Sequence, residues 1–459
     1  MQGGRIMKKS SRFGLDVSRR RLLQAGAGVA GMTALGSSAF TWPVRAQGNF
    51  DWQRFKGDKI EVVLAKSPRA DILQRYEEEF EELTGIEVGS EQIPEQQHRQ
   101  KQVIEFTSGN PTFDVTSVSW HVQKRLFGKG QWLEDLGPML EDPEMTAPDF
   151  DAADFSKAGM VYATQADGRV DTLPMVIDYW IIYWNTALFD AKGVAYPQTY
   201  DELVEAAKAL HDPDNDVYGF VARGLKNANT PVWTSFLLGW DVDSVDAQGQ
   251  LNTTGPEAVA AAELYQTLNQ NYAPPGVVGF NWNECQTIFS QGQAAMWFDG
   301  IGFAPPLEDP AQSKVVGNVG YGVVPAGPTA QHSGMFGQGM GVSAFSENKG
   351  AAYCYCQWST NKLNQARVLE EGAGSPCRNS AYQNEQALAN LRVPMAWVDS
   401  LVESGKIGRP GLPVIIPVTE FRDIYGVALT NMIGGADPAE ELAKATEQFT
   451  PILAKSEQG

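Results

Sequence analysis

The chain has 459 residues, a formal net charge of −19 and a hydrophobic content of 43%. Since one domain takes about 100–200 residues, this length predicts more than one domain, and the apolar content suffices for ordinary buried cores. The acidic excess argues against nucleic acid or an anionic membrane as a partner, because like charges repel.

The N-terminal 46 residues have the features of a secretory signal. Residues 18–21 (SRRR) are basic, residues 22–44 are uncharged and rich in Gly and Ala, and residues 44–46 (VRA) match a cleavage site. The paired arginines favour the twin-arginine export route. A membrane anchor is the alternative, but the apolar stretch falls short of the ~20 predominantly apolar residues that span a bilayer. We therefore predict cleavage after Ala46 and a soluble periplasmic protein.

Strand and helix patterns alternate over the first part of the mature chain. The predicted strands are 59–65, 86–90 and 113–118, and the predicted helices are 71–83, 98–107 and one that begins at 122–127. Strands that alternate with helices of this length indicate βαβ units and a largely parallel sheet. Ligand sites in such sheets lie beyond the carboxyl ends of the strands.

The pattern restarts near residues 173–174 (LP) and predicts a second α/β unit. Predicted strands follow at 179–184, 218–221, 294–298 and 319–324, and the glycine-rich stretch 334–341 leads into strand-like 341–344. Predicted helices cover 185–189, 200–210, 256–269, 283–291, 351–361, 362–371, 419–433 and 438–453. Thr199 is placed to cap the helix at 200–210. No internal repeat is visible after the signal.

The four cysteines, Cys285, Cys354, Cys356 and Cys377, leave their redox state open. An exported location permits disulfides, and Cys377 with Cys354 or Cys356 is one alternative. Buried free thiols are the other alternative. The C-x-C spacing is not a zinc pattern.

A run of alternating acids, Asp212, Asp214 and Asp216, resembles the start of a calcium loop. Val217 stands where such a loop requires glycine, and turn chemistry explains the acids equally well. We expect neither a metal site nor a cofactor.

Several motifs recur in an order and spacing typical of one family. They are 113–115 (FDV) with Trp120, 130–136 (GQWLEDL), 173–174 (LP), 183–189 (YWNTALF), 292–300 (GQAAMWFDG), 339–343, 351–352 and 409–410. Together they resemble the periplasmic sugar-binding subunits of ABC importers, the large extracellular solute-binding family that includes maltose-binding protein. The Trp-x-Asp of residues 297–299 is similar to the branch that takes up small sugars and polyols.

The resemblance implies a type II-like periplasmic binding protein with two α/β lobes and a ligand cleft between them. Each lobe would be a mostly parallel sheet flanked by helices. The first lobe would comprise 50–174 plus 326–361, and the second 175–325 plus 362–459. Hinge closure on the ligand would create the face that the ABC permease recognises. The chain would be a monomer and a binding protein rather than an enzyme.

A sugar or polyol presents apolar C–H faces and hydroxyl groups, so aromatic rings and planar polar groups are the candidate contacts. Trp297 and Asp299 would point to one face of their strand because side chains alternate. Trp120 and His121 follow the strand at 113–118, at its carboxyl end. These four are candidate ligand-binding residues.

Four further candidates come from the family resemblance. It places Asp178 and Tyr179 after the first crossover, at the centre of the cleft. It also directs a group such as Arg378, after the turn 374–376, toward the ligand. Arg223, after the strand 218–221, is a similar candidate, and a guanidinium suits vicinal hydroxyls or an anionic sugar. Packing is the more expected role for Trp233, Trp282, Phe336 and Gln338.

Three alternatives to a neutral sugar or polyol stay open. Arg223 and Arg378 together in the cleft would admit a sugar acid or a sulfonated sugar, and several cleft acids around aromatic rings would suit a polyamine. A glycoside hydrolase needs two carboxylates about 5–10 Å apart. Asp178 and Asp299 could supply them, although no sequence motif marks either as catalytic.

Overall fold

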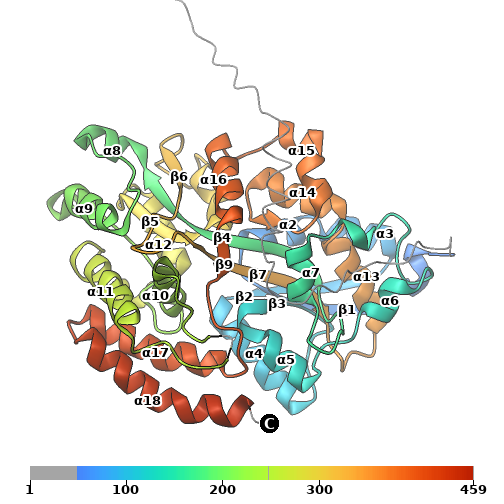
Figure 1. The fold of residues 1–459 in the computed structure, drawn as a ribbon. Helices are drawn as coiled ribbons and strands as arrows, with labels where there is room; N and C mark the ends of the chain where they lie inside the picture. The colour runs from blue at the N-terminus through green and yellow to red at the C-terminus, as the bar shows by residue number, and fades with distance from the viewer. Residues whose placement is uncertain (1–48, 247, 458–459) are drawn as a thin grey trace, which may run out of the picture.

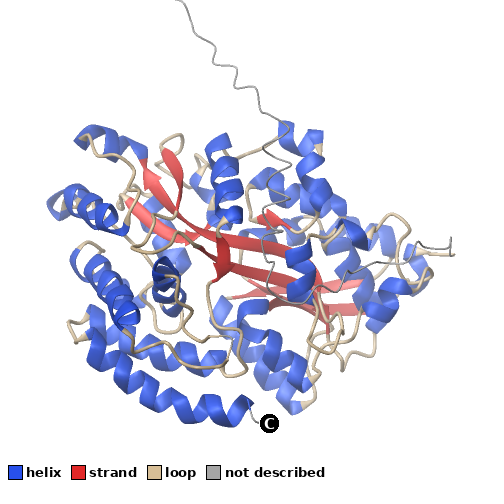
Figure 2. Ribbon diagram, in the orientation of Figure 1, coloured by secondary structure: helices blue, strands red, loops and turns tan. Residues whose placement is uncertain are grey.

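The computed structural model describes residues 49–246 and 248–457, which form an α/β fold with strands at the centre and helices around them (Figures 1 and 2). The predicted signal and its cleavage site lie outside the described residues. Along the central sheet, the strand order is β2-β1-β3-β7-β4-β5. Within the described ranges, no helix combines the length and apolar character needed to cross a bilayer.

The first predicted units form as expected. β1 (Lys59–Ala65) pairs in parallel with β2 (Glu87–Ile93) and with β3 (Val115–Ser119). The helix expected at 71–83 is two helices, α2 (Pro68–Arg75) and α3 (Glu77–Thr84), because Tyr76 leaves the helical conformation with ψ 8°. α4 (Glu95–Ser108) and α5 (Trp120–Gly130) follow β2 and β3 directly.

Two long strands run antiparallel through the middle of the molecule. β4 (Leu173–Asn185) pairs antiparallel with β7 (Ser333–Val342), β5 (Met296–Gly300) and β6 (Val319–Val323), and β7 also pairs antiparallel with β3. Parallel pairing is thus concentrated in β1 to β3, and the α/β class is as predicted.

The glycine-rich stretch that precedes residue 341 is part of β7, not a separate loop. Its glycines serve close packing: a Cβ on Gly337 would lie 2.6 Å from the ring of Trp120, and one on Gly339 would lie 2.8 Å from the same ring. These glycines therefore let the indole lie flat against the strand.

Further helices cover the sheet on both sides (Figure 1). They are α6 (Gly137–Glu141), α7 (Lys157–Ala163), α8 (Thr186–Lys192), α9 (Tyr200–Leu210), α10 (Thr230–Leu237), α11 (Pro256–Asn271), α12 (Trp282–Ser290), α13 (Lys349–Ser359), α14 (Lys362–Glu371), α15 (Glu385–Ala389), α16 (Met395–Lys406), α17 (Val418–Ile433) and α18 (Pro438–Glu457). Two short strands, β8 (Ser375–Pro376) and β9 (Gly408–Pro410), pair with β4 and β7. The segment expected as a strand at 218–221 makes only single bridges, Tyr218 to Ala294 and Val221 to Trp297.

The buried apolar side chains form two core clusters, and β4 contributes to both. Tyr179, Ile181 and Tyr183 belong to one cluster, whereas Trp180 and Ile182 belong to the other. Alternation along the strand sends successive side chains to opposite faces. All four cysteines are buried and free, so the disulfide alternative for Cys377 is not realised.

Candidate functional site

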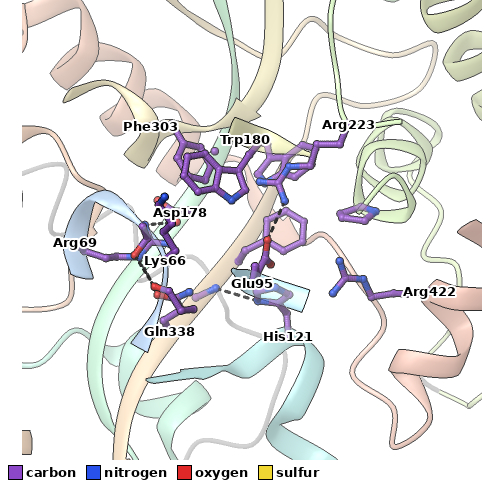
Figure 3. A pocket seen from close by; sticks show the side chains of 17 residues that line it. Lys66, Arg69, Glu95, His121, Asp178, Trp180, Arg223, Phe303, Gln338 and Arg422 are labelled. Carbon is purple, nitrogen blue, oxygen red and sulfur yellow. Dashed lines mark hydrogen bonds and ion pairs between the residues drawn. The ribbon is translucent and has the colours of Figure 1, made fainter. Parts of the chain in front are cut away.

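A cavity opens where the ends of several strands meet (Figure 3). Its walls come from the segment after β1, the first turns of α4 and α5, the middle of β4 and β7, and α17. The lining residues are Ala65, Lys66, Ser67, Arg69, Glu95, His121, Asp178, Trp180, Arg223, Pro231, Trp282, Gly300, Phe303, Phe336, Gly337, Gln338 and Arg422. Its free volume is about 50 Å³.

Ion pairs fix the polar part of the wall. Arg69 Nη1 lies 2.9 Å from Asp178 Oδ2, and Arg69 Nε donates to Gln338 Oε1 at 2.8 Å. Burial raises the pKa of Asp178, and the charge of Arg69 opposes that rise. A paired and buried carboxylate of this kind is held in one orientation.

A second ionic group extends behind the wall and includes two residues of the cavity, Arg223 and Glu95. Arg223 Nε donates to Asp299 Oδ2 at 2.9 Å and Arg223 Nη2 to Asp299 Oδ1 at 2.5 Å, a bidentate pair. Arg223 Nη1 also lies 3.5 Å from Glu95 Oε2, and Glu95 Oε1 accepts from Arg99 at 2.5 Å. Burial would raise the pKa of Glu95, but these arginines and Arg422 outweigh burial and hold it well below the usual range.

Aromatic rings form the apolar part of the wall. Trp282 stacks on Phe303 with ring centroids 4.7 Å apart, and Trp180 packs against Phe336 at 5.2 Å. The guanidinium of Arg223 lies 5.1 Å from the Trp180 ring centroid, within cation–π range. The cavity therefore presents flat apolar faces beside fixed charged groups.

His121 stands at the edge of this aromatic group as a neutral side chain. Its ring meets Phe336 edge-on at 4.8 Å, and its Nδ1 accepts from the backbone N–H of Gly337 at 3.4 Å. Burial, together with the nearby charge of Arg422, lowers the pKa of His121 to about 3. At neutral pH the imidazole is therefore uncharged.

With this geometry established, comparison with known proteins is informative. Residues 66–366 match the family described as bacterial extracellular solute-binding protein, which is more than half of the chain. The chain belongs to this family. The family resemblance predicted from the motifs is thereby confirmed.

Individual relatives align with most of the length of this solute-binding protein. The erythritol/L-threitol-binding protein of Mycolicibacterium smegmatis is 24% identical over 97% of this chain and 99% of its own length. The mannitol-binding protein of Pseudomonas aeruginosa is 26% identical over 70% of this chain and 72% of its own. A solved ABC transporter solute-binding protein from Agrobacterium radiobacter K84, in complex with ribitol, aligns with a TM-score of 0.78 and 25% identity, covering 86% of this chain and 98% of that one. The predicted two-lobe fold is confirmed.

The structure brings four of the eight predicted residues to the cavity region. His121, Asp178 and Arg223 line the cavity, and Asp299 lies directly behind Arg223 as its bidentate partner. Of the candidates expected mainly to pack, Trp282, Phe336 and Gln338 line the cavity too. Trp233 instead stacks on Tyr425 and donates to the carbonyl of Ala258.

The aromatic residues among the other four are core residues. Trp297 is fully buried and stacks on Tyr183 at 4.7 Å. Trp120 stacks on Tyr162 at 5.5 Å, and its Nε1 donates to Thr172 Oγ1 at 2.9 Å. Tyr179 is 1% exposed and belongs to the first core cluster. Burial in the first core cluster keeps these rings away from the cavity.

Arg378 also lies elsewhere. Its guanidinium donates to the carbonyls of Phe150 and Asp151, each at 2.6 Å, and to that of Thr360 at 3.0 Å. The rings of Phe150 and Phe155 flank the guanidinium at 4.3 and 3.8 Å. The cationic pair of Arg223 with Arg378, expected for an anionic sugar, is therefore not formed at the cavity.

Among the cavity residues that sequence reasoning missed, six have charged or aromatic side chains: Lys66, Arg69, Glu95, Trp180, Phe303 and Arg422. A signal existed for three of them, because Lys66 and Arg69 follow the carboxyl end of β1 and Glu95 follows that of β2. Arg422 lies within a long helix remote in sequence, and no local pattern marks it. Within the described ranges, no three His, Cys, Asp or Glu side chains cluster as a metal site.

Proposed function

We propose that this solute-binding protein captures a small polyhydroxy compound, a polyol or a sugar, in the cavity and delivers it to the permease of an ABC importer. The single observation that carries the proposal is the wall itself, in which the Trp180–Phe336 and Trp282–Phe303 ring pairs stand beside the fixed Arg69–Asp178 pair. The ligands named for the relatives, erythritol, L-threitol, mannitol and ribitol, support the same class.

The chemistry of the wall fits such a ligand. Aromatic rings pack against C–H faces, while Asp178 accepts from hydroxyl groups and Arg69 and Arg223 donate to them. A site built to hydrogen-bond hydroxyls rejects analogues that lack them, because its buried polar groups would be left unpaired. The small free volume, about 50 Å³, favours a small polyol over an oligosaccharide.

Contacts across the cleft support capture by lobe closure. Glu95 reaches Arg223, and on the same helix Gln96 Nε2 donates to the carbonyl of Lys226 at 3.1 Å. We propose the lobe division 50–174 plus 326–361 against 175–325 plus 362–459, with one change. α14 joins the first lobe, because Arg75 pairs with Glu371 on α14 at 2.5 Å, and α14 also pairs with Glu79 on α3 through its own arginine.

Export by the twin-arginine route and work as a periplasmic monomer complete the proposal. The family is extracellular, and the basic residues 18–21 ahead of a Gly/Ala-rich stretch support this route. No observation favours the hydrolase alternative, since Asp178 and Asp299 are each held by an arginine. A polyamine is disfavoured by the arginines in the wall.

The test is a thermal-shift and calorimetric screen of the chain from Gln47 against neutral polyols, sugars, their acids and polyamines. A ligand at 100 times its dissociation constant should stabilise the protein by about 2.7 kcal/mol. Asp178→Asn should weaken binding by tenfold or more, because a hydrogen bond to a charged group contributes about 1.5–3 kcal/mol. Asp190→Asn, at an exposed carboxylate of α8, is the matched control. If no polyhydroxy compound binds, the proposed function is wrong.

A further inference from the structure

The charges of the cavity wall do not balance. Four cationic side chains line it, Lys66, Arg69, Arg223 and Arg422, against the two carboxylates of Glu95 and Asp178. His121 adds no charge at neutral pH, because its pKa lies near 3. The rest of the mature chain is strongly acidic, so a positive cavity is a local feature and not a reflection of overall composition.

When the neighbouring charges are paired, two cationic side chains, Lys66 and Arg422, have no carboxylate partner within the described ranges. Asp178 forms an ion pair with Arg69, and Asp299 forms one with Arg223. Glu95 lies between Arg99 and Arg223. Throughout the part of the chain that the structure describes, neither Lys66 nor Arg422 lies within 4.0 Å of a carboxylate. Lys66 is exposed to solvent, which screens its charge.

Solvent does not screen the charge of Arg422 in this way. Its residue is 1% exposed, its Nε donates to the carbonyl of Asn227 at 3.0 Å, and its Nη1 has no hydrogen-bond partner among the described residues. Burial and the like charges of Arg99 and Arg223 lower the pKa of Arg422 well below its ordinary value. The charges of Glu95 and Asp423 oppose this shift only in part. A buried guanidinium that forms no ion pair is destabilising, and an anion in the cavity would remove that cost.

The polar groups suited to hydroxyls lie on the other side. Figure 3 shows Arg422 at one side of the cavity and the Arg69, Asp178 and Gln338 group at the opposite side, with Glu95 and His121 between them. A ligand that spans the cavity therefore meets a free cation at one end and a fixed acceptor and donor set at the other.

We infer that the cargo is a polyhydroxy anion, a polyol chain or small sugar that carries one acidic group such as a carboxylate. Arg422 binds the acidic group, and Asp178 with Arg69 and Gln338 binds the hydroxyl groups at the far end. This inference rests on the proposed function of the cavity and narrows its ligand class. It differs from the sequence-based expectation of an Arg223–Arg378 pair. The second arginine at the cavity is Arg422, and Arg378 lies elsewhere.

The decisive experiment compares each neutral polyol with its own acid by titration calorimetry on the chain from Gln47. The pairs are ribitol with D-ribonate and D-mannitol with D-mannonate, and the 5-phosphate of ribitol separates a dianionic phosphate from a carboxylate. We expect the preferred acid to bind at least tenfold more tightly than its polyol, and higher salt to narrow the gap.

Arg422→Gln should abolish that preference and bring the acid to the affinity of the polyol. It should not lower the melting temperature of the unliganded protein, because it removes an uncompensated buried charge. Arg409→Gln is the control, since Arg409 pairs with Asp241 and Asp243 outside the cavity. It should leave the preference intact.

The outcomes separate the two proposals. If the neutral polyol binds as tightly as its acid or more tightly, the anionic cargo is wrong and the proposed function stands. If neither the polyols, the sugars nor their acids bind, both are wrong. If Arg422→Gln does not fold, the comparison of acid and polyol on the wild-type chain decides alone.

Discussion

At the scale of single residues, burial decides which side chains of the cavity carry charge. Asp178 and Glu95 keep arginine partners, whereas His121 accepts from the backbone N–H of Gly337 and lies near the positive charge of Arg422. In such surroundings the neutral form of His121 has a lower free energy than the charged form. For the same reason, a bound anion would stabilise the buried guanidinium of Arg422.

The part-buried imidazole of His121 predicts a pH dependence of stability. The pKa of His121 is about 3 in the folded chain and about 6.5 in the unfolded chain. Between these values the unfolded chain binds a proton that the folded chain does not, so stability falls as the pH falls through this window. The slope from this residue is about 1.4 kcal/mol per pH unit.

Urea unfolding of the wild type and of His121→Gln from pH 7 to pH 4.5 measures this slope. The variant lacks the titrating group, so the difference in free energy of unfolding between the two proteins should shift steadily in favour of the variant as the pH falls. Two parallel curves would show that His121 is protonated in the folded state at an ordinary pH.

The predicted residues that line the cavity are mainly those with a position in the topology. His121 comes at the carboxyl end of a strand and Asp178 in the crossing strand, and both reach the cavity. Trp297, Trp120 and Tyr179 do not line it, because composition marks an aromatic ring but not its direction. All three are at most 1% exposed, and Trp297 and Trp120 each stack on a tyrosine ring. Arg422 needed tertiary structure to be found.

At the scale of elements, the start of α4 connects the two sides of the cleft. Glu95 contacts Arg223, Gln96 reaches the carbonyl of Lys226, and Arg99 Nη2 donates to Asn227 Oδ1 at 3.4 Å. Asn227 has a positive φ of 74°, so the loop that presents these groups has a specific backbone conformation. The loop and the helix thus form one polar contact across the cleft.

Glu95→Gln should loosen this contact. The amide keeps the shape of the side chain but removes the one carboxylate that lies between Arg99 and Arg223, whose charges then repel each other. Loss of one partner of a buried pair costs about 3–5 kcal/mol, and less here because the Glu95 side chain is 17% exposed. We expect a lower free energy of unfolding in urea and a larger radius of gyration of the unliganded protein by X-ray scattering.

Glu91→Gln is the matched control, because Glu91 has a largely exposed side chain and only a 3.6 Å pair with Lys101. It should change neither quantity. An unchanged radius of gyration for Glu95→Gln would show that the other contacts hold the cleft without this carboxylate.

Most elements could be predicted because hydrophobic periodicity is local. β1 has the predicted limits, and the helices at 200–210 and 362–371 coincide with α9 and α14. The strand pattern of β7 was hard to recognise because of its glycines. Two of them allow the Trp120 ring to approach the strand closely. The antiparallel course of β4 and β7 could not be read from local patterns, since pairing direction depends on segments about 160 residues apart in the chain.

At the scale of the whole molecule, function depends on export before binding. The twin-arginine route distinguishes arginine from lysine, whereas a general secretory signal needs only positive charge in its n-region. Replacement of the three arginines at 19–21 by lysine should therefore make the full-length precursor accumulate and remove the periplasmic form that begins at Gln47. Intact mass of the periplasmic fraction measures both species, and unimpaired export of the lysine variant would contradict the route.

The family and its two-lobe fold could be predicted from scattered motifs because the order of motifs along the chain reflects the order of elements. The division of the chain between the lobes stays a prediction. The sequence indicated the second lobe for α14, and its ion pairs with α2 and α3 support the proposed change to the first lobe. Such boundaries depend on which surface a helix covers, and a helix with exposed charges on one face gives little indication of that surface.

The course of β4 has a consequence for how such a protein can change its cargo over evolutionary time. Asp178 and Trp180, on one side of this strand, line the cavity, whereas Tyr179 and Ile181, on the other side, lie within a packed core. Mutations at Asp178 therefore act on specificity and mutations at Tyr179 and Ile181 on folding, while Trp180 serves both because it also packs in the second core cluster. A lineage can acquire a new nutrient by exchanging the few cavity residues of one strand while its other residues preserve the scaffold.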